Sequence, residues 1–301
     1  MADDYKALKD KFTPVQLICC AAARQFNDRE TVFGGVGLSF LAVAIAKRVY
    51  APNIILVAEA GYVGFACVSS MVSPSDSVGG YMAFCHQGLF ENFRDQQAGL
   101  IDSACLGFAQ MDRFGNVGVT YVEPMIRING SGGGGDISSS ARSVVYIGEY
   151  NPRQFQVKVD YLTNPGFLDG NPDARRRAGL PGGGPKCVVT NRGIFRFDPE
   201  THEMYLAEVF PWQDEEEIAE IVAATPWSLQ VSKDLKIIKP PTEDENKAIV
   251  LMDPQLRYMI TVALERPAGK VILSGKTDLA SYDYLLALNE NRWRKNMGFL
   301  L

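Results

Sequence analysis

A single glutamate stands where a buried strand is expected to end. The segment Ile54-Ile-Leu-Val-Ala is apolar without alternation, which is typical of a strand covered on both faces, and Glu59 follows it directly. Open α/β sheets bind their ligands outside the carboxyl ends of such strands. A carboxylate at this edge of the sheet therefore lies where a ligand is expected to bind. A carboxylate that only caps a helix or faces solvent is the alternative, and spacing alone leaves it open.

Glycines supply the second set of candidates. Gly61 has no Cβ, so the chain can turn there and another group can approach the backbone. The densest glycine cluster, Gly130-Ser-Gly-Gly-Gly-Gly135, presents backbone N–H groups without side-chain obstruction and is suited to bind an anion or oxyanion. It lacks the Gly-Lys-Ser/Thr ending of a nucleotide P-loop. A flexible surface loop is the alternative interpretation.

The first sixty residues are organised to position this glutamate. Thr13-Pro-Val-Gln16 predicts a helix start with a capping box, and the helix is expected to continue to about residue 26. A short strand at 31–33, the loop Gly34-Gly-Val-Gly37 and a helix over 38–50 lead into the Glu59 strand. This order predicts parallel strands joined by a crossover helix. It imitates a dinucleotide-binding motif, but Phe40 occupies the third glycine position, which makes a nicotinamide site a weak hypothesis.

The rest of the chain predicts a mixture of parallel and antiparallel structure. Strands are expected at 100–109, 117–122, 143–147, 156–159, 187–191, 194–197 and 204–209. Helices are expected to start near residue 137, at 214–217 and, with a capping box, at 242–245. Arg175-Arg-Arg177 lies among glycines and prolines, where we favour a solvated surface turn over a phosphate site. The predicted class is α/β, with a mostly parallel central sheet, flanking helices and an antiparallel portion.

Composition excludes several classes of protein. The 301 residues are 47% apolar and 22% charged, as in ordinary globular proteins, and allow one large or two medium domains. A net charge of -5 without a cationic stripe argues against nucleic-acid binding. The acidic start and the short apolar stretch at 33–46 argue against a signal peptide and a membrane span. Six scattered cysteines and only two histidines favour a cytoplasmic protein with reduced thiols and no metal site.

An ordered series of motifs resembles the β-type subunits of class I CoA-transferases, above all those of the glutaconate CoA-transferases. The resemblance covers residues 12–231. The motifs are Gly34-Gly-Val-Gly37, Ala46-Lys-Arg-Val-Tyr-Ala-Pro-Asn53, Glu59-Ala-Gly61, Ala109-Gln-Met-Asp-Arg-Phe-Gly-Asn116, the cluster at 130–135, Asp160-Tyr-Leu-Thr-Asn-Pro-Gly-Phe-Leu-Asp-Gly170 and Gly179-Leu-Pro-Gly182. It implies the three-layer fold of CoA-transferases and NagB-like proteins.

The resemblance also implies a mechanism. The glutamate of the family's Glu-x-Gly motif is a covalent nucleophile, and Glu59 occupies that position. It implies transfer of CoA from an acyl-CoA to a free carboxylic acid, possibly a dicarboxylic acid, through a glutamyl-CoA thioester. Coenzyme A is then a substrate, and no cofactor is bound permanently. Glycine backbone would stabilise oxyanions or contact CoA, and the candidates are Gly35, Gly37, Gly61, Gly132, Gly133 and Gly134.

The resemblance further implies an α-type partner chain, in an α2β2 or larger hetero-oligomer, with the active site at the boundary between the chains. We expect a transferase domain over residues 1–236 and a helical extension over 237–301, packed on that domain or on a partner. Two departures from relatives are Ala60, where a polar residue is common, and the length of this extension. Ring-opening acyl-CoA hydrolases, decarboxylases and an inert structural subunit remain alternatives, but retention of Glu59 favours transfer.

Overall fold

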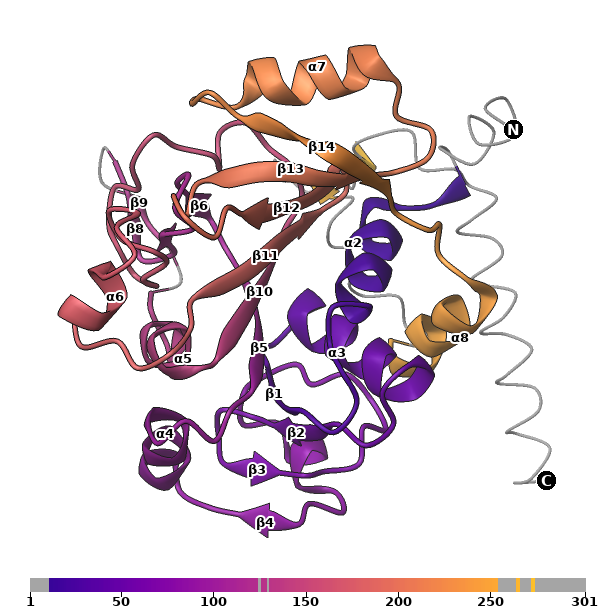
Figure 1. Cartoon of the computed structure of the whole chain (residues 1–301). Coiled ribbons are helices and arrows are strands. Elements are labelled where there is room, and N and C mark those ends of the chain that lie inside the picture. The colour runs from indigo at the N-terminus through magenta and orange to yellow at the C-terminus, as the bar shows by residue number, and fades with distance from the viewer. Residues whose placement is uncertain (1–10, 124–125, 129, 254–263, 266–271, 274–301) are drawn as a thin grey trace.

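Parallel strands form the centre of a large sheet in the computed structural model, which describes residues 11–123, 126–128, 130–253, 264–265 and 272–273. The ten strands of this sheet run in the order β14-β13-β12-β11-β10-β5-β1-β2-β3-β4 (Figure 1). Their bounds are β1 Thr31–Gly34, β2 Ile55–Val57, β3 Tyr62–Val63, β4 Cys85–His86, β5 Ser103–Gly107, β10 Ser143–Ile147, β11 Pro185–Thr190, β12 Gly193–Phe197, β13 Met204–Val209 and β14 Gln230–Ile237.

The pairing confirms the predicted combination of parallel and antiparallel strands. The neighbours β2, β1, β5, β10 and β11 are parallel, with Phe33 opposite both Val57 and Ala104. The pairs β11–β12 and β12–β13 are antiparallel, as are β2–β3 and β3–β4 at the other end of the sheet. Because β1, β2 and β5 run in one direction, the loops that follow them meet at one edge of the sheet.

Helices cover both faces of the sheet, as Figure 1 shows. They are α2 Pro14–Ala23, α3 Leu38–Val49, α4 Leu89–Gln97, α5 Gly134–Ser140, α6 Ala174–Arg177, α7 Glu215–Ala224 and α8 Glu243–Met252, with a 3-10 turn at Ser77–Gly80. One buried cluster joins α2, α3 and α8 to the sheet, and a second joins α5 and α7 to the opposite face. Among the described residues, no helix is long and apolar enough to cross a membrane.

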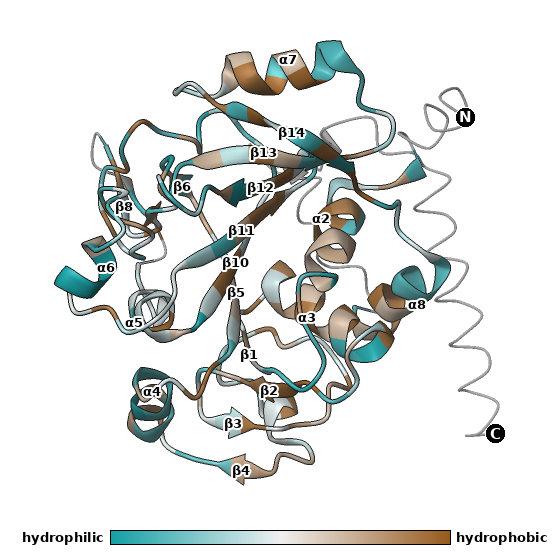
Figure 2. Ribbon diagram, viewed as in Figure 1, coloured by the Kyte–Doolittle hydropathy of each residue, from teal (hydrophilic) through white to brown (hydrophobic). Residues whose placement is uncertain are grey.

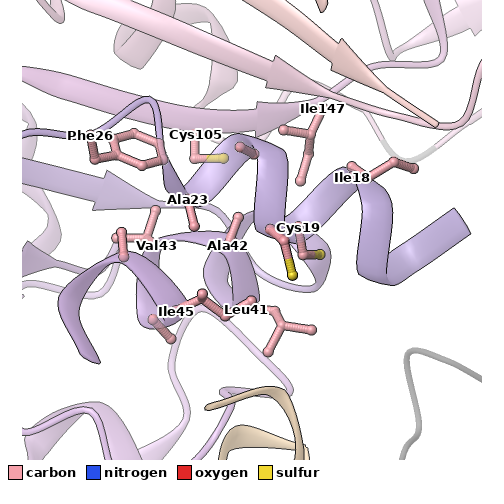
Figure 3. Close-up of a cluster of buried hydrophobic side chains, with 14 of the residues drawn as sticks. Ile18, Cys19, Ala23, Phe26, Leu41, Ala42, Val43, Ile45, Cys105 and Ile147 are labelled. Atoms are coloured by element: carbon pink, nitrogen blue, oxygen red, sulfur yellow. The ribbon is translucent and has the colours of Figure 1, made fainter. Parts of the chain in front are cut away.

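Small side chains let α2 and α3 pack closely in the first cluster. Cys19 and Ala23 of α2 face Ala42 of α3, and Ile147 of β10 closes the cluster from the sheet side (Figure 3). Each fully buried Ile or Leu side chain in such a core contributes about 1.5–3 kcal/mol. Figure 2 shows apolar residues on β2 and on α2 and α3, whereas most of β14 is hydrophilic.

The predicted helix starts are confirmed by their caps. The Thr13 hydroxyl accepts a hydrogen bond from the Gln16 amide at 3.3 Å, and the Gln16 side chain accepts one from the Thr13 amide at 2.8 Å. Thr242 and Glu245 form the same reciprocal pair at the start of α8. These caps satisfy backbone N–H groups that a helix leaves without an internal partner. The first helix nevertheless ends at Ala23 rather than near residue 26.

The helix α8 is fixed to the start of the chain by a buried ion pair. Arg24 donates to both carboxylate oxygens of Glu245 at 2.9 and 2.6 Å, and the Glu245 side chain is fully buried. Gln16 donates to Asn246 at 3.0 Å beside this pair. The predicted extension from residue 237 therefore begins with a helix that packs on α2 and α3, while the division of the chain at residue 236 stays a prediction.

We expect Arg24→Ala to lower the free energy of unfolding by about 3–5 kcal/mol, because it leaves the Glu245 charge buried without its partner. Urea unfolding followed by circular dichroism measures this loss. Lys247→Ala is the control, since Lys247 forms only exposed ion pairs on the same helix, and it should unfold like the wild type. Equal stability of the Arg24→Ala and wild-type chains would contradict the prediction.

Three predicted strands differ from the structure. No strand forms over 156–159, where only the Gln156 amide pairs with Met111, while Val157 and Lys158 are exposed. The strand predicted over 117–122 is two strands, β7 (Val117–Gly118) paired with β6 (Gln110–Met111), and β8 (Tyr121–Val122) paired with β9 (Ile126–Arg127). The strand predicted over 100–109 is confirmed only over β5. The amphipathic pieces predicted near the C-terminus lie outside the described residues.

Candidate active site

Glu59 lies in the turn between β2 and β3, two residues beyond the end of β2 and at the carboxyl edge of the parallel strands. Its side chain is partly buried and points toward the glycine cluster that precedes α5. A Cβ placed on Gly133 would lie 2.8 Å from Glu59 Oε1, and one placed on Gly132 would lie 3.8 Å from it. The structure therefore brings together Glu59 and Gly132–Gly133, which are more than seventy positions apart in the sequence.

The main chain at Glu59 is held by α4. The buried Asn92 side chain donates to the carbonyl oxygens of Ala58 at 3.2 Å and of Glu59 at 2.9 Å. These bonds fix the turn while leaving the Glu59 carboxylate unengaged, since that carboxylate forms no hydrogen bond or ion pair with any described residue. A carboxylate without a cation partner keeps its electron pairs available for attack.

Gly61 allows a close approach of two backbone segments. It has a φ of 95°, and a Cβ there would lie 2.0 Å from the carbonyl oxygen of Gln87. Its N–H donates to Ala58 O at 3.0 Å, and its carbonyl accepts from Gln87 N at 3.0 Å. Gly61 therefore shapes the turn that carries Glu59, and its amide is engaged within that turn.

Backbone hydrogen bonds divide the other candidate glycines into two groups. The Gly35 amide donates to Cys105 O at 3.1 Å, and the Gly134 amide donates to Ser131 O at 2.9 Å. The amides of Gly37, Gly132 and Gly133 donate to no backbone carbonyl within the described part of the chain. An amide that already donates inside the protein is a poor donor to a ligand, so the second group is better suited to meet an oxyanion.

The loop at 34–37 reaches the same edge of the sheet. Gly37 has a φ of 88°, its Cβ direction is open, and it precedes α3, which has no side-chain cap. The first amides of such a helix lack intrahelical partners. Phe40, which occupies the third glycine position of the dinucleotide motif, is buried and stacks on Phe65 with ring centroids 6.1 Å apart.

Arg175 anchors the other end of α5, and the interpretation of the arginine run as a solvated turn is wrong for this residue. Its guanidinium is buried, and burial lowers the pKa of Arg175. The charge of this guanidinium is stabilised by backbone carbonyl dipoles rather than by a carboxylate of the described residues. The five acceptors, at 2.8–3.1 Å, are the carbonyl oxygens of Ser138, Ser139, Pro165, Gly166 and Gly182.

This arrangement ties the last carbonyls of α5 to the loops at 164–170 and 179–184. Because Gly132 and Gly133 directly precede this seven-residue helix, bonds at its C-terminal end also restrict their position. Arg176 and Arg177 are exposed, as predicted, and pair with Asp173 and Asp169.

We expect Arg175→Met to lower the free energy of unfolding by about 3 kcal/mol or more, because buried carbonyls lose a charged donor. Urea unfolding measures the effect. Arg176→Met, which removes only an exposed pair on the same short helix, serves as the matched control and should be unchanged. Wild-type stability in Arg175→Met would show that water replaces the guanidinium at no cost.

Sequence reasoning missed two residues that support the site. Asn92 lies in a polar helix and carries no motif, so only its contacts reveal it. Arg175 shares its run with two exposed arginines, and its neighbours in sequence give no sign of its burial. The surrounding loop motifs, Asn164-Pro-Gly and Gly179-Leu-Pro-Gly182, were the available signal, because they supply or adjoin the carbonyls that Arg175 binds.

Comparisons with known proteins identify the family of this chain. Residues 16–220 match the family model for coenzyme A transferase. The chain is 34% identical over 245 residues to the B-type subunit of glutaconate CoA-transferase from Acidaminococcus fermentans, covering 76% of this chain and 88% of that protein. It is 31% identical over 239 residues to the B-type subunit of 3-oxoadipate CoA-transferase from Pseudomonas knackmussii, covering 78% and 90%.

A solved structure shows the same fold. The crystal structure of glutaconate coenzyme A-transferase from Acidaminococcus fermentans superimposes with a TM-score of 0.75 at 29% identity, covering 86% of this chain and 99% of that one. The family-model match over residues 16–220 includes the segments that carry Glu59 and the glycine cluster. The chain therefore belongs to the coenzyme A transferase family, as a β-type chain of its class I.

Proposed function

We propose that this chain is the β-type half of a CoA-transferase that uses Glu59 as a covalent nucleophile. The observation that carries the proposal is the position of Glu59 Oε1 beside Gly132 and Gly133, where a Cβ on Gly133 would lie only 2.8 Å from it. The carboxylate is partly shielded, has no cation partner among the described residues and lies beside unengaged backbone amides. These are the requirements for a weak nucleophile that must attack a thioester.

The first half-reaction forms two intermediates on Glu59. A carboxylate oxygen attacks the thioester carbonyl of an acyl-CoA, and the carbon–sulfur bond breaks. CoA leaves as a thiolate, and an acyl-glutamyl anhydride remains on the protein. The thiolate then attacks the glutamyl carbonyl of the anhydride. The bond to the bridging oxygen breaks, the original acid departs as its carboxylate, and Glu59 carries CoA as a thioester.

The second half-reaction reverses these steps with another acid. Its carboxylate attacks the glutamyl thioester, which again gives an anhydride and CoA thiolate. The thiolate attacks the new acyl carbonyl, so that a new acyl-CoA leaves and the Glu59 carboxylate is restored. The two half-reactions consume no water, oxidant or metal, and the bond energy of the thioester is conserved throughout.

Every attack passes through a tetrahedral oxyanion that needs hydrogen-bond donors. The amides of Gly132 and Gly133 are the best placed for the glutamyl oxyanion, because they lie beside Glu59 and are not engaged with backbone carbonyls in the described chain. Loss of one such donor typically costs about 2.7–4 kcal/mol. Gly37 is the candidate donor from the neighbouring loop.

We further propose that an A-type chain completes the enzyme. The two relatives compared above each carry the name of a B-type subunit, which presupposes an A-type counterpart. The Glu59 side chain remains partly exposed in the isolated chain, whereas the anhydride must be protected from hydrolysis. A second chain over this edge of the sheet would exclude water, and it would provide contacts that select the acids.

The test is to trap the intermediate. The paired chains are incubated with an acyl-CoA and no acceptor acid, digested, and analysed by mass spectrometry for CoA on the peptide that contains Glu59. Borohydride should reduce the thioester and protect that residue as an alcohol, and addition of an acceptor acid before borohydride should discharge the adduct. Steady hydrolysis of acyl-CoA without an adduct would support a hydrolase instead, and exchange without any modification of Glu59 would refute the covalent role.

A further inference from the structure

The side chain of Asn164 lies against the first residue of α5. Asn164 is buried, with only 2% of its surface exposed. A Cβ placed on Gly134 would lie 2.8 Å from Asn164 Oδ1 and 3.2 Å from Asn164 Nδ2. A Cβ on the preceding residue, Gly133, would lie 2.8 Å from Glu59 Oε1. Two consecutive glycines therefore bring the Glu59 carboxylate and a buried amide against one short loop.

The Asn164 amide lies between α5 and the sheet. Burial raises the pKa of the Tyr146 hydroxyl on β10, while the Asn164 side chain opposes this rise. Ser138 of α5 opposes it as well, so the hydroxyl, the amide and the helix lie close together. Tyr146 and Ile137 of α5 also belong to one buried cluster. The position of Asn164 therefore influences how the start of α5 packs on the sheet.

The main chain holds Asn164 in a fixed position. Its backbone amide donates to Val117 O, and its carbonyl oxygen accepts from Val117 N, both at 3.0 Å. Pro165 follows it and restricts its backbone to extended conformations. The carbonyl oxygens of Pro165 and Gly166 in turn accept hydrogen bonds from Arg175. The Asn164 side chain is thus a fixed contact for the glycine cluster.

Stability does not account for an amide at this position. Asn164 Oδ1 is buried and accepts no hydrogen bond from any described residue. Burial of an amide oxygen without a donor lowers stability, and an apolar side chain of similar size would fill the space without that cost. A buried polar group of this kind needs another explanation.

The oxygen lies beside a turn whose N–H groups have no backbone partner. The amides of Gly135 and Asp136, in the first turn of α5, donate to no carbonyl oxygen in the described part of the chain. The first N–H groups of a helix carry partial positive charge. A carboxamide oxygen next to this turn attracts it and opposes its displacement.

We infer that Asn164 is a positioning residue, whose amide holds the start of α5 so that Gly132 and Gly133 stay beside Glu59. The inference rests on the proposed function, which supplies the oxyanion. Negative charge develops on the glutamyl oxygen in each tetrahedral intermediate, and donors must lie about 2.7–3.1 Å from it. Without the amide, the first turn of α5 can shift and withdraw these donors. Asn164 therefore acts on the reaction through the loop.

Asn164→Leu separates this role from a structural one, because leucine fills the space and removes the amide. In the paired chains, kcat for CoA exchange should fall about tenfold or more, since small displacements of reacting groups are costly. The KM for acyl-CoA should stay within about twofold. The urea midpoint should equal or exceed that of the wild type, because an unpartnered oxygen is lost. Asn164→Ala should lose kcat similarly and serves as the second variant.

Asn171→Ala is the matched control on the same loop. Asn171 is exposed, and its side chain accepts a hydrogen bond from the Asp173 amide rather than contacting α5. Its kcat, KM and urea midpoint should be those of the wild type.

Hydrogen exchange reads the position of the loop without relying on activity. In paired chains that carry Asn164→Leu, the amides of residues 130–135 should exchange about fivefold faster or more, while the core strands β5 and β10 exchange as in the wild type. Faster exchange throughout the chain together with a lower urea midpoint would instead show a structural role and overturn the inference.

Wild-type kcat in both Asn164→Leu and Asn164→Ala, with Glu59→Gln inactive, would also overturn it. Failure of the proposed function is recognised separately, as CoA exchange by Glu59→Gln. Unchanged exchange at residues 130–135 in Asn164→Leu would refute the contact itself, whatever reaction the loop supports.

Discussion

The Glu59→Gln variant is expected to lose CoA transfer by about 10⁴-fold or more in kcat, measured with the paired chains as exchange of CoA between an acyl-CoA and a free acid. An amide cannot attack the thioester, so neither the anhydride nor the glutamyl-CoA thioester forms. The loss corresponds to about 5 kcal/mol of transition-state stabilisation. Folding should be unaffected, because the Glu59 carboxylate has no hydrogen bond to any described residue and its backbone contact with Asn92 is retained.

Glu59→Asp separates the need for a carboxylate from the need for its position. It keeps the charge but withdraws the oxygens by one methylene from Gly133, and a displacement of about 1 Å is enough to cost about 10²-fold. We therefore expect a slow enzyme that still forms a CoA adduct on residue 59. A Glu59→Gln variant with wild-type exchange would place the nucleophile elsewhere.

The position of the catalytic turn was predictable because its signals are local. An unbroken apolar run ends at Ala58, and Glu59-Ala-Gly61 follows, so the strand, its end and the turn are all encoded within eight residues. The caps at Thr13 and Thr242 are local in the same sense. The parallel pairing of β1 and β2 follows from the helix between them, since a crossover leaves few alternatives.

Features that depend on distant partners were not predictable. The strand β14 is polar and largely exposed at the end of the sheet, so it has no apolar alternation to reveal it. The burial of Arg175 depends on carbonyls from three separate segments. The approach of Gly133 to Glu59 depends on how α5 packs against α4, which no local pattern specifies. Sequence supplied the candidate glycines, and only the fold distinguishes engaged amides from unengaged ones.

The unengaged amide of Gly133 is the basis of the second prediction with a large expected effect. Gly133→Ala is expected to reduce kcat by about 10²-fold with little change in stability. The backbone at Gly133 has φ -83° and ψ 1°, which alanine adopts readily, so the substitution is not strained. Its Cβ, however, would lie 2.8 Å from Glu59 Oε1, closer than carbon and oxygen tolerate. The carboxylate must move away from the amides that we propose for the oxyanion, and a displacement of this size is costly.

Two controls decide whether the effect comes from Glu59. Gly107→Ala has no atom closer than 3.9 Å to the new methyl group and should be as active as the wild type. The Gly133 methyl group would also lie 2.4 Å from the Phe93 ring, so Phe93→Leu should be combined with Gly133→Ala to relieve that contact alone. If the double variant regains full kcat, the loss arises from Phe93 and the proposed role of the Gly133 space is wrong. If kcat stays low while acyl-CoA binding is normal, the methyl group acts on the carboxylate, because Glu59 Oε1 is the nearest atom to it outside Phe93.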